Sequence, residues 1–424
     1  MNTIESVVIE GFWGDRTVEL KFNEDVNFLI GRNGSGKTTL INLVAAALAA
    51  DFQNLDRVAF DSITIRLSEV GGRKKPSVIV RKTDQHIPPF PGVTYYIKES
   101  AGAKAKEYSL DDFEEQFRYR QYRMSMAHEL RKRHGNSILE QLSELVRVSW
   151  LSVHRYSGRQ NREERSWESA VDRKLEVLSN AFVRFFSKLS DGATDLLVDF
   201  QKKVFLSLLS DQTDVQITSQ VRRLDFDQER AALEDIYKQF DLNPSQYKKK
   251  TTRHFGLLNE GLEKLNDGTG MSLSHLGALT GTVRIHAVVE EWNKLISQRR
   301  ELFEPKETFL KILNSMVLGK EFFINEKNEL SVTGSSGEPF SLTQLSSGEK
   351  QLLIVLGEAL LQERRPWVYI ADEPELSLHV SWQESLVRNL IAINPNAQII
   401  FATHSPDIVS TYGDSVFDMQ DALL

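Results

Sequence analysis

The sequence predicts an α/β protein whose main domain is built from both ends of the chain, with a large and mainly helical insertion between them. Three observations support this fold class. Strand-type runs dominate the first hundred residues, apolar residues then recur at three- and four-residue spacing, and strands alternate with helices again from residue 321. We therefore expect the first half of the domain at 1–105, the insertion at 106–318 and the second half at 319–424.

The first half reads as strands with one helix. Val26–Ile30 is a short apolar run that leads into a glycine-rich segment and then into an apolar helix from Leu40 to Ala50. Further strands, separated by turns that contain Gly or Pro, are expected at Ile4–Glu10, Thr17–Phe22, Ile63–Leu67, Ser77–Arg81 and Val93–Ile97.

The insertion and the second half differ in their periodicity. Apolar residues between Leu175 and Phe186 share one helical face, and a strand-like run at Val146–Val153 interrupts the helices. No a/d heptad is sustained over several turns, so a long coiled-coil arm is not expected. Other helices are expected near 110–134, 195–212, 227–240 and 282–318. The second half is expected to hold a polar hairpin from 321, helices at 347–362 and 379–393, and strands at Trp367–Ala371 and Gln398–Ala402.

Composition narrows the class of protein. The 424 residues are 41% hydrophobic and 26% charged, as in ordinary globular proteins, and the net charge of −7 limits any nucleic-acid contact to a local basic patch. Cysteine is absent, which excludes disulfide frameworks, zinc fingers and thiol catalysis. The N-terminus lacks the features of a signal peptide, and the apolar run at 40–50 is too short to cross a bilayer. We expect a cytoplasmic protein with no membrane contact.

Residues 31–38, GRNGSGKT, fit the phosphate-binding pattern G-x-x-x-x-G-K-[ST] between a strand and a helix. The glycines let backbone N–H groups turn inward around phosphate oxygens, and the helix N-terminus adds its dipole. Lys37 is expected to bridge the β- and γ-phosphates of ATP, and the Thr38 hydroxyl to bind Mg²⁺. The residues expected to hold the nucleotide here are Gly31, Asn33, Gly34, Ser35, Gly36, Lys37, Thr38 and Thr39.

A pair of acids ends the apolar strand near residue 370. Asp372 is expected to hold Mg²⁺ through water, and Glu373 to polarise the water that attacks the γ-phosphate. Two acids at a strand end are common as turn residues, but the phosphate loop makes the catalytic interpretation the better one. The long separation between loop and acids independently predicts an insertion.

A third segment, LSSGEKQ at 345–351, precedes an amphipathic helix and offers a serine hydroxyl and helix N-terminal amides to an anion. It resembles the signature motif of ABC-type ATPases in the form found in SMC and recombination proteins. Pro374–His379 resembles the D-loop region of that family. The resemblance implies that the signature contacts ATP bound to another protomer, so that ATP joins a head-to-head dimer. The residues assigned to this second half-site are Ser346, Ser347, Gly348 and Glu349.

His404 follows the last predicted strand in the segment ATHSP. Its order after the other motifs resembles that of the ABC switch histidine, which contacts the γ-phosphate. Together with Glu373 it forms the expected catalytic pair. The family's Q-loop glutamine stays open between Gln53 and Gln160.

Among ABC-type ATPases, the motifs are most similar to stand-alone, OLD-like ATPases of bacterial anti-phage systems, namely AriA of PARIS and PtuA of the Septu or retron systems. This resemblance implies a homo-oligomer, of dimers at least, that senses a phage protein or nucleic acid. It also implies that the sensor holds and releases a nuclease of Toprim or HNH type. Few residues follow His404, so the nuclease is expected to be encoded separately.

The function of the chain and the roles of two of its segments each have an alternative interpretation. The chain also fits a DNA repair or recombination ATPase of the SMC and RecF-like branch. A basic segment with interleaved aromatics at 118–133 is typical of a solvated helix face, and its alternative is a surface for phosphate backbones or an acidic ligand. The two acids of the D-x-D segment Asp225-Phe226-Asp227 are predicted to begin a solvated helix and not to bind a metal.

Overall fold

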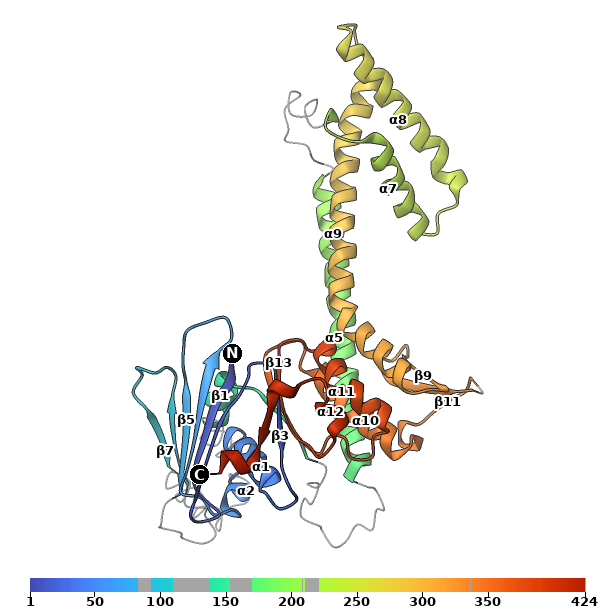
Figure 1. Ribbon diagram of the computed structural model, residues 1–424. Coiled ribbons are helices and arrows are strands. Elements are labelled where there is room, and N and C mark those ends of the chain that lie inside the picture. Colours follow the sequence, from blue (N-terminus) through green and yellow to red (C-terminus); the bar gives the residue numbers. More distant parts are fainter. Residues whose placement is uncertain are drawn as a thin grey trace, which may run out of the picture. The chain divides into compact units, whose positions relative to one another are not determined.

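The computed structural model describes residues 1–82, 93–109, 138–152, 170–207, 209, 221–335 and 337–423 (Figure 1). The helix expected at 110–134, the basic segment 118–133, Gln160 and the side chain of Gln53 lie outside this part of the chain. The chain divides into two compact units, one of Met1–Arg184 with Pro305–Leu424 and one of Phe185–Glu304.

One sheet of the first unit is antiparallel, in the order β2-β1-β4-β5-β6-β7. Its alternating residues bury one face, as in β4, where Ile63, Ile65 and Leu67 are fully buried. The strands are β1 (Asn2–Phe12), β2 (Arg16–Lys21), β4 (Ser62–Glu69), β5 (Ser77–Lys82), β6 (Val93–Lys98) and β7 (Lys106–Ser109).

The second sheet is wholly parallel, in the order β14-β3-β13-β12-β8. Its central strands are buried on both faces, which explains their mainly apolar sequences. The strand-like run inside the expected insertion joins this sheet as β8, beside β12. The strands are β3 (Val26–Ile30), β8 (Val148–Ser152), β12 (Trp367–Asp372), β13 (Ala397–Ala402) and β14 (Val416–Asp418).

Helix α1 (Lys37–Leu48) shares one hydrophobic core with both sheets, which explains why it is apolar on all sides. The short α2 (Phe52–Asp56) follows it. Gln398 of β13 also links the sheets, because its buried amide pairs with the backbone of Ile4 in both directions, at 2.7 and 2.8 Å. The phosphate loop therefore leads into a helix that is buried from Leu40 to Leu48.

The remaining elements of the first unit include the signature segment and the helix that it begins. Within it, the start of α5 packs on α10, where a Cβ at Gly357 would lie 2.6 Å from the Phe182 ring. Lys350 of α10 donates to Asp172 of α5 at 2.7 Å. The expected polar hairpin is confirmed as β9 and β10. The elements are β9 (Lys320–Ile324), β10 (Leu330–Gly334), β11 (Pro339–Phe340), the 3₁₀ turns Leu342–Gln344 and Gly413–Ser415, and helices α10 (Ser347–Leu361), α11 (Val380–Ile393), α12 (Pro406–Val409) and α13 (Met419–Ala422).

The described part of the second unit is helical. Two helices run from one unit into the other, and α5 packs antiparallel on α9 through Gly192 with Leu302 and Phe200 with Trp292. These helices are longer than the separate helical segments that the sequence predicts, whereas the expectation of no coiled coil with regular heptads stays a prediction. The helices are α5 (Ala170–Ser207), α7 (Phe226–Gln239), α8 (Pro244–Asn266) and α9 (Leu273–Met316).

Two smaller findings complete the fold. Asp225 caps α7 by accepting from the backbone N–H groups of Asp227 and Gln228, so the predicted helix start is confirmed. Among the described helices, none is long and apolar enough to cross a membrane. The predicted α/β class, with strands toward both ends of the chain and helices between, is confirmed.

Candidate active site

Three neighbouring strands of the parallel sheet end in one row. Leu29 of β3 pairs with Ala402 of β13, and Ala402 pairs with Asp372 of β12. The residues that follow each strand therefore leave the sheet at the same carboxyl edge, where open α/β sheets bind ligands. This register brings the phosphate loop, the two acids and His404 together, although the sequence places them at opposite ends of the chain.

The phosphate loop has the backbone that its glycines predict. Gly31, Gly34 and Gly36 all have positive φ, of 143°, 80° and 98°. A Cβ at Gly36 would also lie 3.0 Å from ring atoms of Phe12 and Trp13. Both the backbone conformation and the close packing therefore require glycine here.

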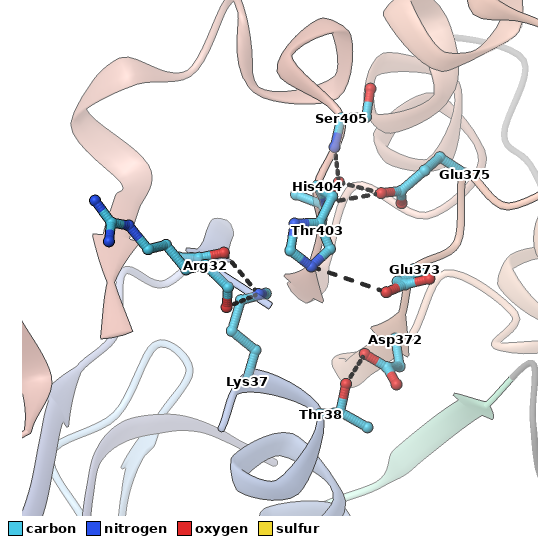
Figure 2. A network of polar contacts seen from close by, with 10 residues as sticks. Arg32, Lys37, Thr38, Asp372, Glu373, Glu375, Thr403, His404 and Ser405 are labelled. Carbon is cyan, nitrogen blue, oxygen red and sulfur yellow. Dashed lines mark hydrogen bonds and ion pairs between the residues drawn. The ribbon is translucent and has the colours of Figure 1, made fainter. Parts of the chain in front are cut away.

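Lys37 is buried beneath this loop, with 5% of its surface exposed. Its Nζ donates to the carbonyl oxygens of Gly31, at 2.8 Å, and Arg32, at 3.3 Å (Figure 2). Burial lowers the pKa of Lys37 below its ordinary value, and the nearby carboxylates, of which Glu373 acts most strongly, oppose the shift. The ammonium is thus held inside the loop, close to acidic side chains.

The acids at the end of β12 meet the start of α1. The Thr38 hydroxyl donates to Asp372 Oδ1 at 3.0 Å, across 334 residues of sequence. Glu373 has a left-handed backbone, with φ of 46°, while its N–H continues the sheet ladder to the Ala402 carbonyl at 2.8 Å. Figure 2 shows Lys37 and Thr38 on one side of the site and the two acids on the other. A hydroxyl and a carboxylate so close together are oxygen ligands that suit Mg²⁺ beside phosphates.

His404 completes this group of residues. Its Nε2 lies 3.9 Å from Glu373 Oε1, and its side chain is 40% exposed. The site adjoins a cavity of about 540 Å³ that is lined by residues of the phosphate loop, the His404 loop and α12. The imidazole therefore faces both the proposed water-activating acid and open space.

Glu375 is a polar residue at this edge that the sequence did not reveal as important. Its Oε1 accepts from the Thr403 hydroxyl at 2.6 Å and from the His404 backbone N–H at 2.9 Å (Figure 2). The sequence feature that could have drawn attention to Glu375 is its position, two residues after the acidic pair in the D-loop-like segment.

Trp13 is a second residue that sequence analysis missed. It lies in the turn after β1 with φ of 59°, is 42% exposed and stacks on Phe12 with ring centroids 4.8 Å apart. An exposed indole beside the phosphate loop can stack on a nucleobase. The sequence feature that could have indicated this residue is an aromatic side chain in a turn flanked by Gly11 and Gly14.

The signature segment forms the start of α10. Ser346 and Glu349 make a capping box, in which Glu349 N donates to Ser346 Oγ at 3.3 Å and Ser346 N to Glu349 Oε2 at 2.8 Å. Lys320 donates to both oxygens of Glu349 at 2.6 Å. Burial favours the neutral acid, but the hydrogen bonds from Lys320 and Ser346 outweigh it and keep the pKa of Glu349 below its ordinary value.

Gly348 of the same segment cannot be replaced without movement, because a Cβ there would lie 2.5 Å from the Ser377 carbonyl oxygen. Ser377 itself has φ of 69°. The hydrogen bonds, ion pairs and close contact described for this segment reach the D-loop-like region, β9 and the start of α5. None of these contacts within the described part of the chain joins the segment to the phosphate loop.

Comparison with known proteins identifies the family. A family model described as an AAA ATPase domain matches residues 3–409, a range that includes every residue of the site. The chain is 28% identical over 133 residues to the retron Vc95 probable ATPase of Vibrio cholerae serotype O1 biovar El Tor, a match that covers 29% of this chain and 25% of that protein. It therefore spans about a quarter of the length of that relative.

Solved structures with a similar course of the chain include two Smc head domains. The head from Pyrococcus furiosus, bound to the C-terminal domain of ScpA, is 12% identical with a TM-score of 0.46, covering 97% of this chain and 92% of that one. The head with a coiled coil and joint from Pyrococcus yayanosii is 12% identical with a TM-score of 0.43, covering 99% and 95%. The family match spans nearly the whole sequence, so the chain is an ATPase that belongs to the AAA ATPase domain family.

Proposed function

We propose that ATP binds at the carboxyl edge of the parallel sheet, with its phosphates against residues 31–39. The positive φ of three glycines, the buried Lys37 and the start of α1 support this assignment. Thr38 and Asp372 fit a site for Mg²⁺, which when bound would neutralise charge on the β- and γ-phosphates. Trp13 would stack on the base.

For hydrolysis, we assign Glu373 to orient and polarise the attacking water and His404 to contact the γ-phosphate. The separation of 3.9 Å between these side chains leaves both free to face a phosphate and its water. Asp372 stays with Thr38 and does not compete for the water. The two neighbouring acids therefore have separate roles.

We further propose that Ser346, Ser347 and Gly348 complete the site of a second copy of the chain, so that ATP joins a homodimer. Ser346 and Ser347 lie at the N-terminus of a 15-residue helix, where backbone N–H groups attract an anion. Glu349, bound to Ser346 and Lys320, would position the segment without touching phosphate.

Changing Ser346 to Arg is expected to prevent the ATP-bound dimer while leaving ATP affinity unchanged. The bulky cation fills the surface that a second copy would approach, and the lost cap costs only about 1 kcal/mol of helix stability. Light scattering with ATP, in a Glu373→Gln background that prevents hydrolysis, measures the mass. Ser297→Arg on the exposed side of α9 is the matched control. An ATP-dependent dimer of undiminished mass would contradict the shared site.

In the cell, we propose that the ATPase is the sensor of an anti-phage system and that it holds and releases a separately encoded nuclease. The observation that carries this proposal is the similarity to a retron ATPase over 133 residues. The closer likeness to AriA or PtuA and the identity of the trigger stay predictions. If ATP joins two copies of the chain, a trigger could act on the sensor by changing the balance between the dimer and the separate copies.

Co-expression with the neighbouring gene tests this function. The two proteins are expected to purify as one complex, and toxicity is expected to require both Lys37 and the catalytic acids of the partner. The chain alone is expected to hydrolyse ATP and to leave DNA and RNA intact with Mg²⁺ or Mn²⁺. Nuclease activity of the isolated chain that is lost with Asp225 or Asp227, but not with Glu373, would overturn the proposal. ATPase activity that depends strongly on DNA would instead favour the repair or recombination function.

A further inference from the structure

The three residues after β13 are held by a small network outside the proposed nucleotide contacts. Thr403 Oγ1 donates to Glu375 Oε1 at 2.6 Å and accepts from Ser405 N at 2.9 Å. His404 N donates to the same Glu375 oxygen at 2.9 Å. One carboxylate oxygen therefore receives two donors, one from each of two successive residues.

Glu375 is itself firmly placed. Its carbonyl accepts from Leu378 N at 2.8 Å, and Glu373 O accepts from Leu376 N at 3.0 Å, so residues 373–378 form a closed double turn. Gln383 extends the connection, because its Nε2 donates to the Leu378 carbonyl at 3.0 Å and its Oε1 accepts from Ser405 Oγ at 2.7 Å. Glu375 thus holds Thr403 and His404, and Gln383 holds Ser405, so each of the three residues after β13 is bound to the segment that follows β12.

The imidazole of His404 depends on this support. Its separation of 3.9 Å from Glu373 is too long for a hydrogen bond, and its side chain is 40% exposed. The backbone of Thr403 and His404, by contrast, is fixed by a charged acceptor, and hydrogen bonds to charged groups are the stronger kind. The direction of the ring is therefore set mainly by the backbone that Glu375 holds.

The second oxygen of Glu375 strengthens this interpretation. Oε2 is buried, and it has no hydrogen-bond partner among the described residues. Burying such an oxygen costs free energy, so the two bonds made by Oε1 must offset that cost for the side chain to keep this position.

We propose that Glu375 is a positioning residue for ATP hydrolysis, which aims His404 at the γ-phosphate by accepting from Thr403 and from the His404 backbone. This inference rests on the proposed role of His404. It assigns Glu375 no contact with ATP, Mg²⁺ or the attacking water.

The test is a double-mutant cycle on the ATPase reaction. Glu375→Ala is expected to lower kcat about tenfold with KM for ATP changed less than twofold, because binding is intact and only the aim of His404 is lost. In a His404→Ala background the same change is expected to have no further effect, because Glu375 acts through that side chain. Glu375→Gln keeps one acceptor oxygen and is expected to stay within about threefold of the unmodified protein.

Two further variants complete the test. Glu384→Ala, an exposed acid on α11, is the matched control and is expected to leave kcat and the melting temperature unchanged. Thr403→Val removes one of the two donors and is expected to lower kcat in the same direction, which provides a test even if Glu375→Ala fails to fold. Additive losses in the cycle, or a Glu375→Gln variant as slow as Glu375→Ala, would overturn the proposal. Full turnover by His404→Ala alone would instead contradict the proposed role of His404.

Discussion

Replacing Lys37 by alanine is expected to weaken ATP binding at least 100-fold. The ammonium is buried in the phosphate loop, where its hydrogen bonds to carbonyl oxygens place it next to the position proposed for the β- and γ-phosphates. Hydrogen bonds between charged groups contribute about 1.5–3 kcal/mol each, and two such bonds to phosphate account for a loss of this size. Isothermal titration with ATP measures it directly.

Lys327→Ala is the matched control for this change, because Lys327 is exposed on the β9–β10 turn. It is expected to bind ATP like the unmodified protein. Unchanged affinity in Lys37→Ala would show that the phosphates bind elsewhere.

Replacing Glu373 by glutamine is expected to slow hydrolysis by a factor of about 10²–10³ while ATP and Mg²⁺ bind normally. Loss of a positioned general base costs about this much, and the amide keeps the size of the side chain. The left-handed backbone of Glu373 and its bond to Ala402 do not depend on the carboxylate, so the pocket stays intact. Single-turnover hydrolysis, with ATP affinity measured separately, distinguishes chemistry from binding.

The exposed Glu384 again provides the comparison, here as Glu384→Gln, which is expected to hydrolyse ATP at the unmodified rate. If Glu373→Gln also did so, the water would have to be activated by another group. Asp372 would then be the next residue to change.

The parts of the site that sequence predicted are those whose chemistry is local. The glycines of the phosphate loop and the two acids after β12 are recognised by spacing alone, because their function depends on neighbours in the chain. The helix cap at Ser346 is of the same kind. These segments lie at the strand ends and helix starts that the sequence predicts. The roles of their residues stay proposals.

The missed features depend on contacts between distant segments. The role of Glu375 follows from a loop 28 residues further along, and no local pattern encodes that pairing. Likewise, the strand at β8 was expected, but its place beside β12 is set by tertiary register.

The expected helices are shorter than those in the structure. The segments expected near 195–212 and 282–318 overlap α5 and α9, which run for 38 and 44 residues, and α5 continues through Gly192, where Leu302 lies at ordinary contact distance. Gly281 in α9 lies where a Cβ would be 2.9 Å from the His254 ring of α8. The helix α8 was not among the expected helices. At Gly281 close packing against α8 outweighs the intrinsic cost of glycine in a helix.

The bond between Thr38 and Asp372 has a consequence for synthesis of the protein. The two residues are 334 positions apart in the sequence. At about 5–20 residues per second, the ribosome therefore needs roughly 20 to 70 s after Thr38 to add Asp372. During that interval the apolar helix α1 has already been made, but β12 and β13, which help to cover it, have not. The antiparallel sheet, complete by Ser109, is available much earlier. A nascent chain that docks α1 on this sheet first would keep this apolar helix covered until the nucleotide site can close.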